Sequence, residues 1–522
     1  MRKLTTFGAV LLLSTLAASP RCSDAQATTP PQVEEISIAE LQAALSERRL
    51  TCRQLVEQYI RRIDAYDKNG PSINSIVLIN PRARAIADSL DGVQMRGGAL
   101  GPLHCIPIVV KDNFETADMP TTAGSLSLAG YMAAKDAFQV KRVREAGAVI
   151  LAKSNMAEFA FSPYETVSSI LPGYSKNPYA LDRVTAGSSG GTAAAVAANF
   201  AAAGLGSDTG NSIRGPSAHQ ALVGIRSTMG LTSRGGVVPL FMGADIAGPM
   251  ARSVADAVAI FQVIVGEDRD DSVTARSRGR PVPNYSQALD ANGLRGARIG
   301  VLRQAYESPT TDPEVVQLFR RALDDLRKQG ATIIDSAMVP ELDSLRRQQT
   351  GGCNTFEYDL NSFLAARGDR VPVKTVDDIL RSRRFHPSIE KRLETAQAVE
   401  GTPDENPGCK SRDAFRAGLR DAVTRMFDRL RLDAVVYPSW SNPPRLIGDL
   451  NTPHGDNNQL FSPSTGFPAI TVPMGYLRGG VLPSGLQFFG RAWSEPALIK
   501  FAYAYEQATH HRRPPITVPP LR

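Results

Sequence analysis

The stretch from Gly187 to Pro216 constrains this chain more than any other part of its sequence. It opens with the small residues Gly187-Ser-Ser-Gly-Gly191, continues through an alanine-rich apolar segment, and closes on a small polar cluster, Asp208-Thr-Gly-Asn-Ser212. Glycines let the backbone approach a ligand closely, and a helix that starts in such a loop offers unpaired N–H donors. A buried helix with a tight turn at each end would give the same pattern. A catalytic interpretation therefore requires that the rest of the chain supply a base for one of these serines.

The composition is that of a globular protein with a large core. Of the 522 residues, 42% are hydrophobic and 21% are charged, and the formal net charge is +7. Basic residues cluster in places, but the clusters are scattered and are not interleaved with aromatic residues, so we interpret them as solvated surface and expect no nucleic-acid partner. These clusters are Arg276, Arg278 and Arg280; Arg381, Arg383 and Arg384; and His510 to Arg513.

The N-terminus has the pattern of a secretory signal peptide. Two basic residues precede an apolar run over 7–18, and Ala25-Gln-Ala27 offers a cleavage site. The run is too short to cross a bilayer, and no later stretch is long and apolar enough, so we expect no membrane partner. Lipid attachment at Cys22 is disfavoured, because Ser19-Pro-Arg21 is a poor approach to a lipid-modified cysteine. We predict a signal peptide at 1–27, a mobile leader at 28–35, and a secreted or periplasmic protein.

Removal of the signal peptide leaves four cysteines, which permit up to two disulfides. Their wide spacing gives no framework pattern, and a bridge between Cys353 and Cys409 is one possibility among several. The remaining two are Cys52 and Cys105. The sequence has no CxxC pair and no histidine–cysteine cluster typical of zinc, so we expect neither a metal nor a cofactor.

Strands and helices alternate over most of the chain, which indicates an α/β fold. From about 340 to 430 the sequence becomes polar, helical and irregular, and we expect an excursion or cap there. The run Ile106 to Val110 is continuously apolar, as in a strand buried on both faces, and it ends on Lys111. An ammonium held in apolar surroundings loses solvation, which lowers its pKa towards neutrality. The same lysine could instead have emerged into solvent or be paired with Asp112.

Two other catalytic motifs compete for the serines. Gly187-Ser-Ser-Gly-Gly191 matches the G-x-S-x-G nucleophile elbow with Ser189 as nucleophile, but the residues before it carry turn chemistry rather than a strand. An elbow also needs a downstream histidine, and His386, His454, His510 and His511 have no distinctive context. Ser388-Ile-Glu-Lys391 matches S-x-x-K without its companion motifs, and we interpret it as a chance match.

The sequence resembles the amidase signature family at several spaced motifs, which together cover nearly all of residues 36–515. The matching residues are Gly101-Pro-Leu-His-x-Ile-Pro107, Lys111-Asp-Asn113, Thr122-Ala-Gly-Ser125, Ala186-Gly-Ser-Ser-Gly-Gly191, Gly206-x-Asp-Thr-Gly-x-Ser-Ile-Arg214, Gly248-Pro-Met-Ala-Arg252 and Gly485-Leu-Gln487. The resemblance implies a single α/β domain over 36–522, with a mixed, mostly parallel central sheet covered by helices on both faces. The pattern looks closest to secreted bacterial peptide amidases.

By position, the resemblance implies a catalytic triad of Lys111, Ser188 and Ser212. Neutral Lys111 would take a proton from Ser188, which follows a cis peptide bond in the family, and Ser188 would take one from the nucleophile Ser212. A bridging hydroxyl can do this because it donates and accepts at once. Asp208 and Arg214 would fix the loop without touching the reacting carbonyl. The resemblance places the oxyanion hole on the backbone N–H groups of Thr209, Gly210, Asn211 and Ser212.

Two residues depart from the family pattern. Asn211 stands where glycine is usual, and because asparagine tolerates left-handed backbone the loop can survive, although the side chain can narrow the site. Cys105 replaces a common glycine, and we interpret it as a packing residue without a redox role.

The resemblance implies hydrolysis of carboxylic amides through a Ser212 acyl-enzyme. Export argues against the tRNA-linked amidotransferase members, and the substrate classes that remain are peptide amides, aryl or alkyl amides, and carbamates. Phe241, Met242, Asp245 and the 340–430 excursion are candidate walls of the pocket. We expect a monomer or a homodimer. Two alternatives stay open: an α/β-hydrolase esterase using Ser189, and a non-catalytic secreted solute-binding protein.

Overall fold

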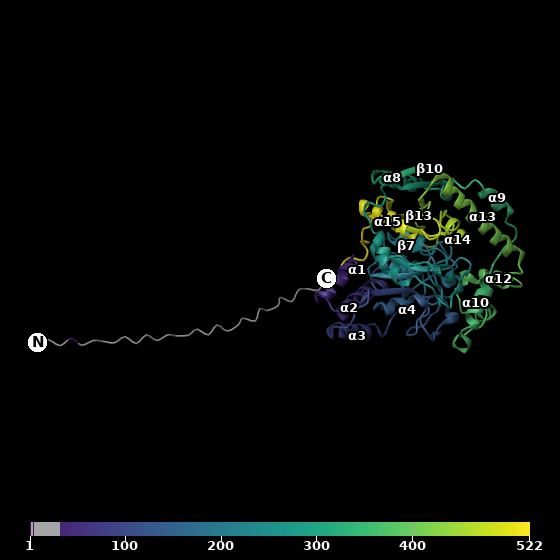
Figure 1. Cartoon of the computed structure of the whole chain (residues 1–522). Coiled ribbons are helices and arrows are strands. Elements are labelled where there is room, and N and C mark those ends of the chain that lie inside the picture. Colours follow the sequence, from purple (N-terminus) through teal and green to yellow (C-terminus); the bar gives the residue numbers. More distant parts are fainter. Residues whose placement is uncertain (2–3, 5–31, 400, 522) are drawn as a thin grey trace.

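The computed structural model describes residues 1, 4, 32–399 and 401–521, so the predicted signal peptide and most of the leader lie outside the described residues. The last leader residues pack on the folded domain: Val33 is buried, Glu34 pairs with Arg62, and Glu35 pairs with Arg512 at 2.7 Å. The first described helices and the C-terminal end of the chain therefore share one face of the molecule (Figure 1).

A single large sheet forms the centre of the molecule. Within the described residues it has eleven strands, and its buried central strands are continuously apolar. In spatial order the strands are β1 (Ile76–Ile79), β3 (Val149–Ser154), β2 (Pro107–Lys111), β6 (Ala203–Asp208), β8 (Ile246–Ala251), β7 (Val223–Arg226), β12 (Ala469–Leu477), β13 (Leu482–Phe489), β11 (Ala434–Pro438), β9 (Arg298–Leu302) and β10 (Thr332–Ala337). A separate two-stranded sheet pairs β4 (Lys176–Asn177) with β5 (Ala180–Val184).

The α/β class and the mixed sheet are confirmed, but the expectation of mostly parallel pairing is wrong for the centre of the sheet. Parallel neighbours occur on its two sides, where β2 lies between β3 and β6 and where β9 lies between β10 and β11. The strands between them pair antiparallel, from β6 through β8, β7, β12 and β13 to β11. The reason is chain connectivity: β12 and β13 form a hairpin, which makes their pairing antiparallel.

Helices pack on both faces of this sheet. One layer contains α5 (Gly190–Ala197) and α6 (Arg214–His219), which lie at the two ends of the stretch that dominates the sequence. The other helices that cover the sheet and its N-terminal edge are α1 (Ile38–Ser46), α2 (Cys52–Ile63), α3 (Ala83–Met95), α4 (Phe138–Glu145), α7 (Val254–Ile264), α8 (Pro313–Lys328) and α15 (Glu495–Thr509). The expected capping boxes that open α1 and α2 are both present, at Ser37 and Thr51.

The excursion over 340–430 is helical, as expected. It contains α9 (Leu342–Gln348), α10 (Phe356–Ala365), α11 (Val376–Ser382), α12 (Glu390–Gln397) and α13 (Pro407–Leu430), and the short α14 (Phe461–Thr465) packs against α13. Apolar side chains of α10 to α12 form a second core with Tyr131, Phe159 and Val238. These helices lie on the side of the molecule opposite the N-terminal helices (Figure 1).

The four described cysteines form two disulfides, Cys52–Cys105 and Cys353–Cys409. The second is the pair that the sequence offered as one possibility, and it ties the start of α13 to the loop before α10. The interpretation of Cys105 as a packing residue is wrong, because its sulfur is bonded to α2. Cys105 also has a positive φ of 62°, the backbone region that favours glycine.

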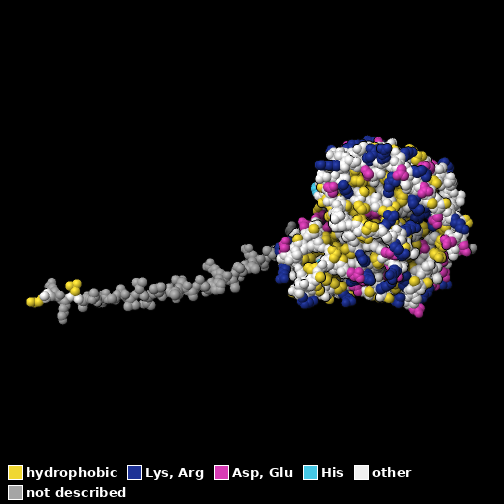
Figure 2. Space-filling model, viewed as in Figure 1, with side chains coloured by type: hydrophobic (Ala, Val, Ile, Leu, Met, Phe, Trp, Pro, Cys, Tyr) yellow, Lys and Arg dark blue, Asp and Glu magenta, His cyan; other side chains and the backbone are white. Residues whose placement is uncertain are grey.

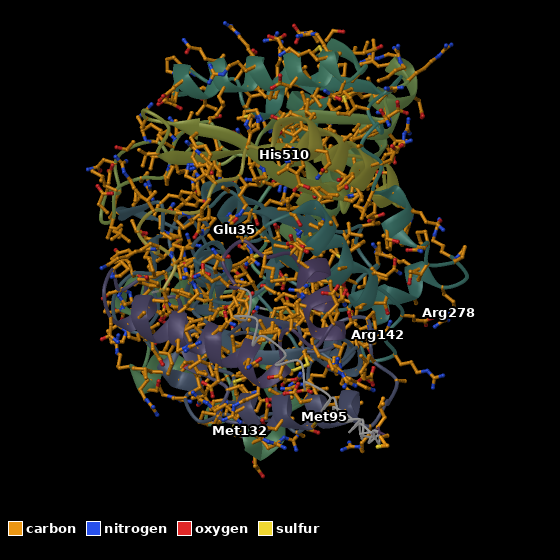
Figure 3. The ribbon with its side chains drawn as sticks, turned by 90° about the vertical axis from the view of Figure 1, so that its left-hand side faces the viewer. Glu35, Met95, Met132, Arg142, Arg278 and His510 are labelled. Atoms are coloured by element: carbon orange, nitrogen blue, oxygen red, sulfur yellow. A yellow bond between two sulfur atoms is a disulfide. The ribbon has the colours of Figure 1, made fainter. Side chains whose placement is uncertain are left out.

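Charged side chains of both signs are interspersed over the face shown in Figure 2. Among the described residues, no helix combines the length and apolar character needed to cross a membrane. No cluster of three or more His, Cys, Asp or Glu residues in the described part of the chain could hold a metal ion. Figure 3 shows the face that carries Glu35 and His510, which line one small cavity together with Arg252 and Glu506.

Candidate active site

Sheet topology brings the sequence motifs together. Strands β2 and β6 are parallel neighbours, so their carboxyl ends meet at the same edge, where β2 ends on Lys111 and β6 ends on Ser207 and Asp208. Helix α5 begins at Gly190, directly after Ser188 and Ser189, and packs on both strands. Polar side chains at the carboxyl edge of parallel strands are where α/β proteins commonly build their sites.

Lys111 is fully buried, and three oxygen atoms surround its amine. Its Nζ lies 2.7 Å from Ser188 Oγ, 2.8 Å from Ser207 Oγ and 3.3 Å from the Ser207 carbonyl oxygen. Burial lowers the pKa of Lys111 to about 7, against the opposing fields of Asp245 and Asp208. The sequence left open whether this lysine is buried, exposed or paired with Asp112; the structure shows it buried and bound to hydroxyl groups. The neutral amine is therefore accessible near neutral pH.

Ser188 sits in a tightly enclosed loop. The Gly187–Ser188 peptide bond is cis, as the resemblance implied, and the Ser188 side chain is buried. A side chain at Gly187 would place its Cβ 2.4 Å from the carbonyl oxygens of both Ser162 and Glu165. Only glycine fits there, which explains why the Gly-rich run precedes the serine.

Ser212 lies across from this loop, at the bottom of a cavity of about 630 Å³. Thr209, Gly210 and Asn211 line the same cavity. Among the hydrogen bonds of the described residues, none uses the backbone N–H groups of 209–212, and none is formed by the Ser212 hydroxyl. These four amide groups are therefore free to bind an anionic oxygen in the cavity.

Asp208 and Arg214 hold the Ser212 loop from behind. Arg214 donates from Nε to Asp208 Oδ2 at 3.1 Å and from Nη2 to the Gly210 carbonyl at 2.7 Å. Arg226, which no sequence motif singled out, donates from Nη1 to Asp208 Oδ1 at 3.0 Å. Burial by itself would raise the pKa of Asp208, but the two guanidinium groups outweigh it and lower that pKa to about 2. The carboxylate stays ionised and the loop stays anchored.

Asn211 is not strained by its departure from glycine. It is absent from the residues with positive φ, so the loop needs no left-handed backbone there. Its side chain donates to the Gly187 carbonyl at 3.2 Å and to the Pro163 carbonyl at 3.0 Å, and it accepts from Asn458 at 2.9 Å. The amide therefore joins the Ser212 loop to the Ser188 loop instead of filling the cavity.

The alternative nucleophile Ser189 faces away from the cavity. It is fully buried, and its hydroxyl donates to the Ser207 carbonyl at 3.1 Å. Strand β5, which was not predicted, lies a few residues before the elbow motif; it belongs to the small separate sheet, so it does not present Ser189 at the edge of the central sheet. Ser388 pairs with His386 at 2.8 Å, in an exposed contact beside α12.

The cavity walls come from regions that the sequence patterns only partly identified. Phe241 lines the cavity, as expected, whereas Met242 lines a neighbouring cavity and Asp245 accepts a hydrogen bond from the Thr209 hydroxyl. The excursion contributes a wall, also as expected. Ser207 was missed as a partner of Lys111, although its place beside Asp208, in a strand-end motif of small polar residues, was a usable signal.

Comparisons with known proteins agree with this geometry. The Amidase family model matches residues 54–499. A probable amidase of Arabidopsis thaliana is 34% identical over 508 residues, which cover 92% of each chain. The native peptide amidase of Stenotrophomonas maltophilia is similar in structure, with a TM-score of 0.82 at 35% identity over 92% of this chain and 98% of that one. A structure of the peptide amidase PAM with the competitive inhibitor chymostatin gives the same score and identity over 92% and 99%.

Proposed function

The chain belongs to the amidase family, whose members are hydrolases of linear carboxylic amide C–N bonds, and on that premise we propose that it cleaves peptide amides through a Ser212 acyl-enzyme. The observation that carries the proposal is the contact between the buried Lys111 amine and Ser188 Oγ at 2.7 Å, beside a cavity that holds Ser212. A serine hydroxyl becomes a nucleophile when a neighbouring base takes its proton, and a buried neutral lysine supplies that base.

The proposed first half-reaction moves two protons. Neutral Lys111 uses two N–H groups to hold Ser207 and its lone pair to accept the Ser188 proton, while Ser188 accepts the proton of Ser212. Ser212 Oγ then forms a bond to the amide carbon, and the carbonyl oxygen becomes an oxyanion held by the free N–H groups of 209–212. Catalytic hydrogen bonds commonly tighten only when substrate binds, which would bring the hydroxyls of Ser212 and Ser188 together.

Collapse of this intermediate breaks the C–N bond. Ser188 returns a proton to the leaving nitrogen and recovers one from Lys111, so ammonia departs from a peptide amide and the acyl group stays on Ser212. A water molecule then attacks the ester carbonyl, passing its proton through the same two groups. The carboxylic acid leaves, and Ser212 regains its hydroxyl proton.

The proposal of a peptide amide rests on the structural relatives. A peptide amidase is 35% identical with a TM-score of 0.82, and a related complex contains a competitive inhibitor. A glutamyl-tRNA(Gln) amidotransferase chain from Thermotoga maritima is less similar, with a TM-score of 0.69 at 25% identity. A cavity of about 630 Å³ has room for several residues on the acyl side of the bond. Aryl or alkyl amides and carbamates are the competing substrate classes.

Active-site labelling tests the nucleophile. A fluorophosphonate should modify one serine, and peptide mass mapping should locate the adduct on Ser212. Incubation with a peptide amide should release ammonia, and Ser212→Ala should abolish both labelling and release. An adduct on another serine would contradict the assignment of Ser212, and the absence of any adduct would favour the binding-protein alternative.

Paired variants separate the two serine mechanisms. The proposal predicts that Lys111→Ala removes activity while Ser189→Ala, which loses one buried hydrogen bond, keeps a folded and active enzyme. An esterase that used Ser189 would show the opposite pattern. Far-UV circular dichroism of both variants checks that the fold survives.

We also propose that the protein is exported. The N-terminal pattern over 1–27 and the two disulfides support this, because disulfides persist in oxidising compartments. Expression of the full chain in a Gram-negative host should yield periplasmic protein whose N-terminus lies at or near residue 28. Cytoplasmic protein that retains Met1 would contradict export without affecting the proposed chemistry.

A further inference from the structure

One wall of the cavity at Ser212 carries a concentration of positive charge. Four arginines from the helical excursion line the cavity, and none of the Asp or Glu residues in the described part of the chain does. These arginines are Arg346 on α9, Arg392 on α12, and Arg412 and Arg416 on α13. A concave surface lined by one sign of charge attracts ligands of the other sign.

The two arginines on α13 are held in place rather than free. The guanidinium carbon of Arg412 lies 4.1 Å from the centre of the Phe241 ring, and that of Arg416 lies 5.5 Å from it. Arg416 also donates to the carbonyls of Gly243 at 2.5 Å and Pro463 at 3.2 Å. These contacts use neutral partners, so they fix the guanidinium groups without neutralising their charge.

Nearby carboxylates compensate little of this charge. Asp413 lies 3.2 Å from Arg412 Nε, but its side chain is 66% exposed, and surface pairs of this kind are weak. Asp359 lines the neighbouring cavity, where it accepts hydrogen bonds from the Met242 N–H and the Thr355 hydroxyl. Burial, together with the charges of Arg412 and other arginines, lowers the pKa of Arg416 to about 10 despite the opposing charge of Asp413.

The positive wall continues beyond Phe241. A second cavity of about 390 Å³ shares Phe241, Arg412 and Arg416 with the first and adds Arg276 and Arg420. A substrate that extends past Phe241 would therefore keep meeting arginines. When ammonia is the leaving group, all the bulk of the substrate lies on the acyl side, so the acyl side faces this wall.

Resting on the proposed peptide-amide hydrolysis, we propose that the enzyme selects acidic peptide amides, with Arg412 and Arg416 as specificity-determining residues for carboxylate side chains near the scissile amide. Guanidinium groups match the geometry of carboxylates and bind them through paired N–H donors. Arg346, which is exposed at the rim of the same cavity, adds attraction over a longer distance.

Three matched peptide amides test the proposal. Each has the sequence acetyl-Ala-Xaa-Xaa-Ala-amide, with Xaa as Glu, Gln or Lys, and ammonia release gives kcat/KM. We expect the Glu peptide to exceed the Gln peptide at least tenfold and the Lys peptide to be the slowest. Raising the salt concentration from about 0.05 to about 0.5 M should shrink the Glu/Gln ratio, since screening weakens charge attraction.

Arg412→Gln should bring the Glu/Gln ratio close to one while leaving the Gln peptide within about threefold of wild type. Arg425→Gln is the matched control: it removes one arginine from the same helix, at an exposed position paired with Glu341 at 3.1 Å, and should keep the ratio. Arg346→Gln, at an exposed position, should lower the ratio severalfold and covers the case in which Arg412→Gln does not fold.

Equal rates for the Glu and Gln peptides in the wild type would overturn the specificity while leaving the peptide-amide function intact. So would an equal loss of both rates in Arg412→Gln, because the arginine would then act only as packing. Failure to hydrolyse any of the three peptides would instead contradict the proposed function itself.

Discussion

Two buried lysines stand at the ends of neighbouring parallel strands, and only one of them faces the site. Lys111 ends β2 and Lys153 lies near the end of β3, where Lys111 pairs in register with Ser154 and Lys153 with Val110. Both side chains are fully buried. Successive residues of a strand point to opposite faces of the sheet, so this one-residue offset sends the two amines to different surroundings.

The surroundings differ in charge and in the number of donors they require. Lys153 lies 3.3 Å from Asp112 Oδ1 and donates to the carbonyls of Phe114 at 2.7 Å and Pro120 at 3.2 Å. Burial lowers the pKa of Lys153, but the Asp112 charge opposes the shift. Lys111 contacts hydroxyl groups and one carbonyl instead. Burial alone therefore does not make a base; a partner that can give up a proton does.

The largest expected effect separates the two lysines by activity. Lys111→Met should lower kcat/KM for a peptide amide on the order of 10⁴-fold, because the proton relay loses its terminal base. The apolar replacement fills the same buried space, so thermal unfolding should show a stability equal to or above wild type. A variant that kept more than a tenth of the wild-type rate would end the assignment of Lys111 as the base.

The reciprocal substitution should act on stability. Lys153→Met leaves Asp112 buried without its cation, and we expect urea unfolding to show a loss of about 3–5 kcal/mol. Asp112 Oδ2 would still accept from the Thr122 N–H at 3.2 Å, which keeps part of the loop in place. The folded fraction should retain kcat within a few-fold of wild type. A stable but inactive Lys153→Met would erase the distinction between the two lysines.

The sequence could predict one half of this comparison and not the other. Both lysines follow an apolar run, so the pattern alone ranks them equally; the family motifs, not the pattern, singled out Lys111. The partners of Lys153 come from the loop over 112–122, whose path no local pattern specifies. For the same reason Ser207 and Arg226 were missed, although both lie in or beside strands of the predicted α/β fold.

The fold shows the same limit. Helix starts were predictable, because the capping boxes at Ser37 and Thr51 are local signals. The pairing of the sheet was not, because strand order depends on contacts between residues distant in sequence, and the antiparallel centre was missed. Cys105 was misinterpreted because its partner Cys52 lies on a different element.

The third prediction uses pH. Lys111 has a pKa of about 7 in the folded protein, so kcat/KM should fall about tenfold per pH unit below 7 and level off above about 8, as the neutral amine becomes fully populated. A profile flat from about pH 5 to 9 would contradict the relay.

The same group should leave a signature in stability. The unfolded value is near 10.5, so the unfolded chain binds more protons between about pH 7 and 10.5, and stability rises with pH across that window. Below pH 7 the amine is protonated in both states, and the cost of burial is fully present. Chemical unfolding of wild type and Lys111→Met at about pH 6 and about pH 9 should show a larger rise in the wild type. An identical rise in both proteins would mean that Lys111 does not titrate in this range.

The smallest expected effect concerns the residue that orients the Lys111 amine. Ser207 Oγ lies 2.8 Å from Lys111 Nζ and accepts a hydrogen bond from the Asn113 side chain at 3.0 Å. Ser207→Ala removes one of the two contacts that direct the lone pair of Lys111 towards Ser188, while the Ser207 carbonyl at 3.3 Å remains. We expect kcat to fall about 10-fold with KM nearly unchanged, since a neutral hydrogen bond is worth about 1 kcal/mol and bound substrate does not touch Ser207. The inflection of the pH profile should also move, because the amine loses a polar neighbour. Ser154→Ala is the matched control on β3, where the hydroxyl pairs with Thr192 at 2.7 Å beside Lys153, and it should leave kcat and the profile unchanged. If both alanine variants lower kcat equally, the Ser207 hydroxyl supports packing at this sheet edge and does not orient the base.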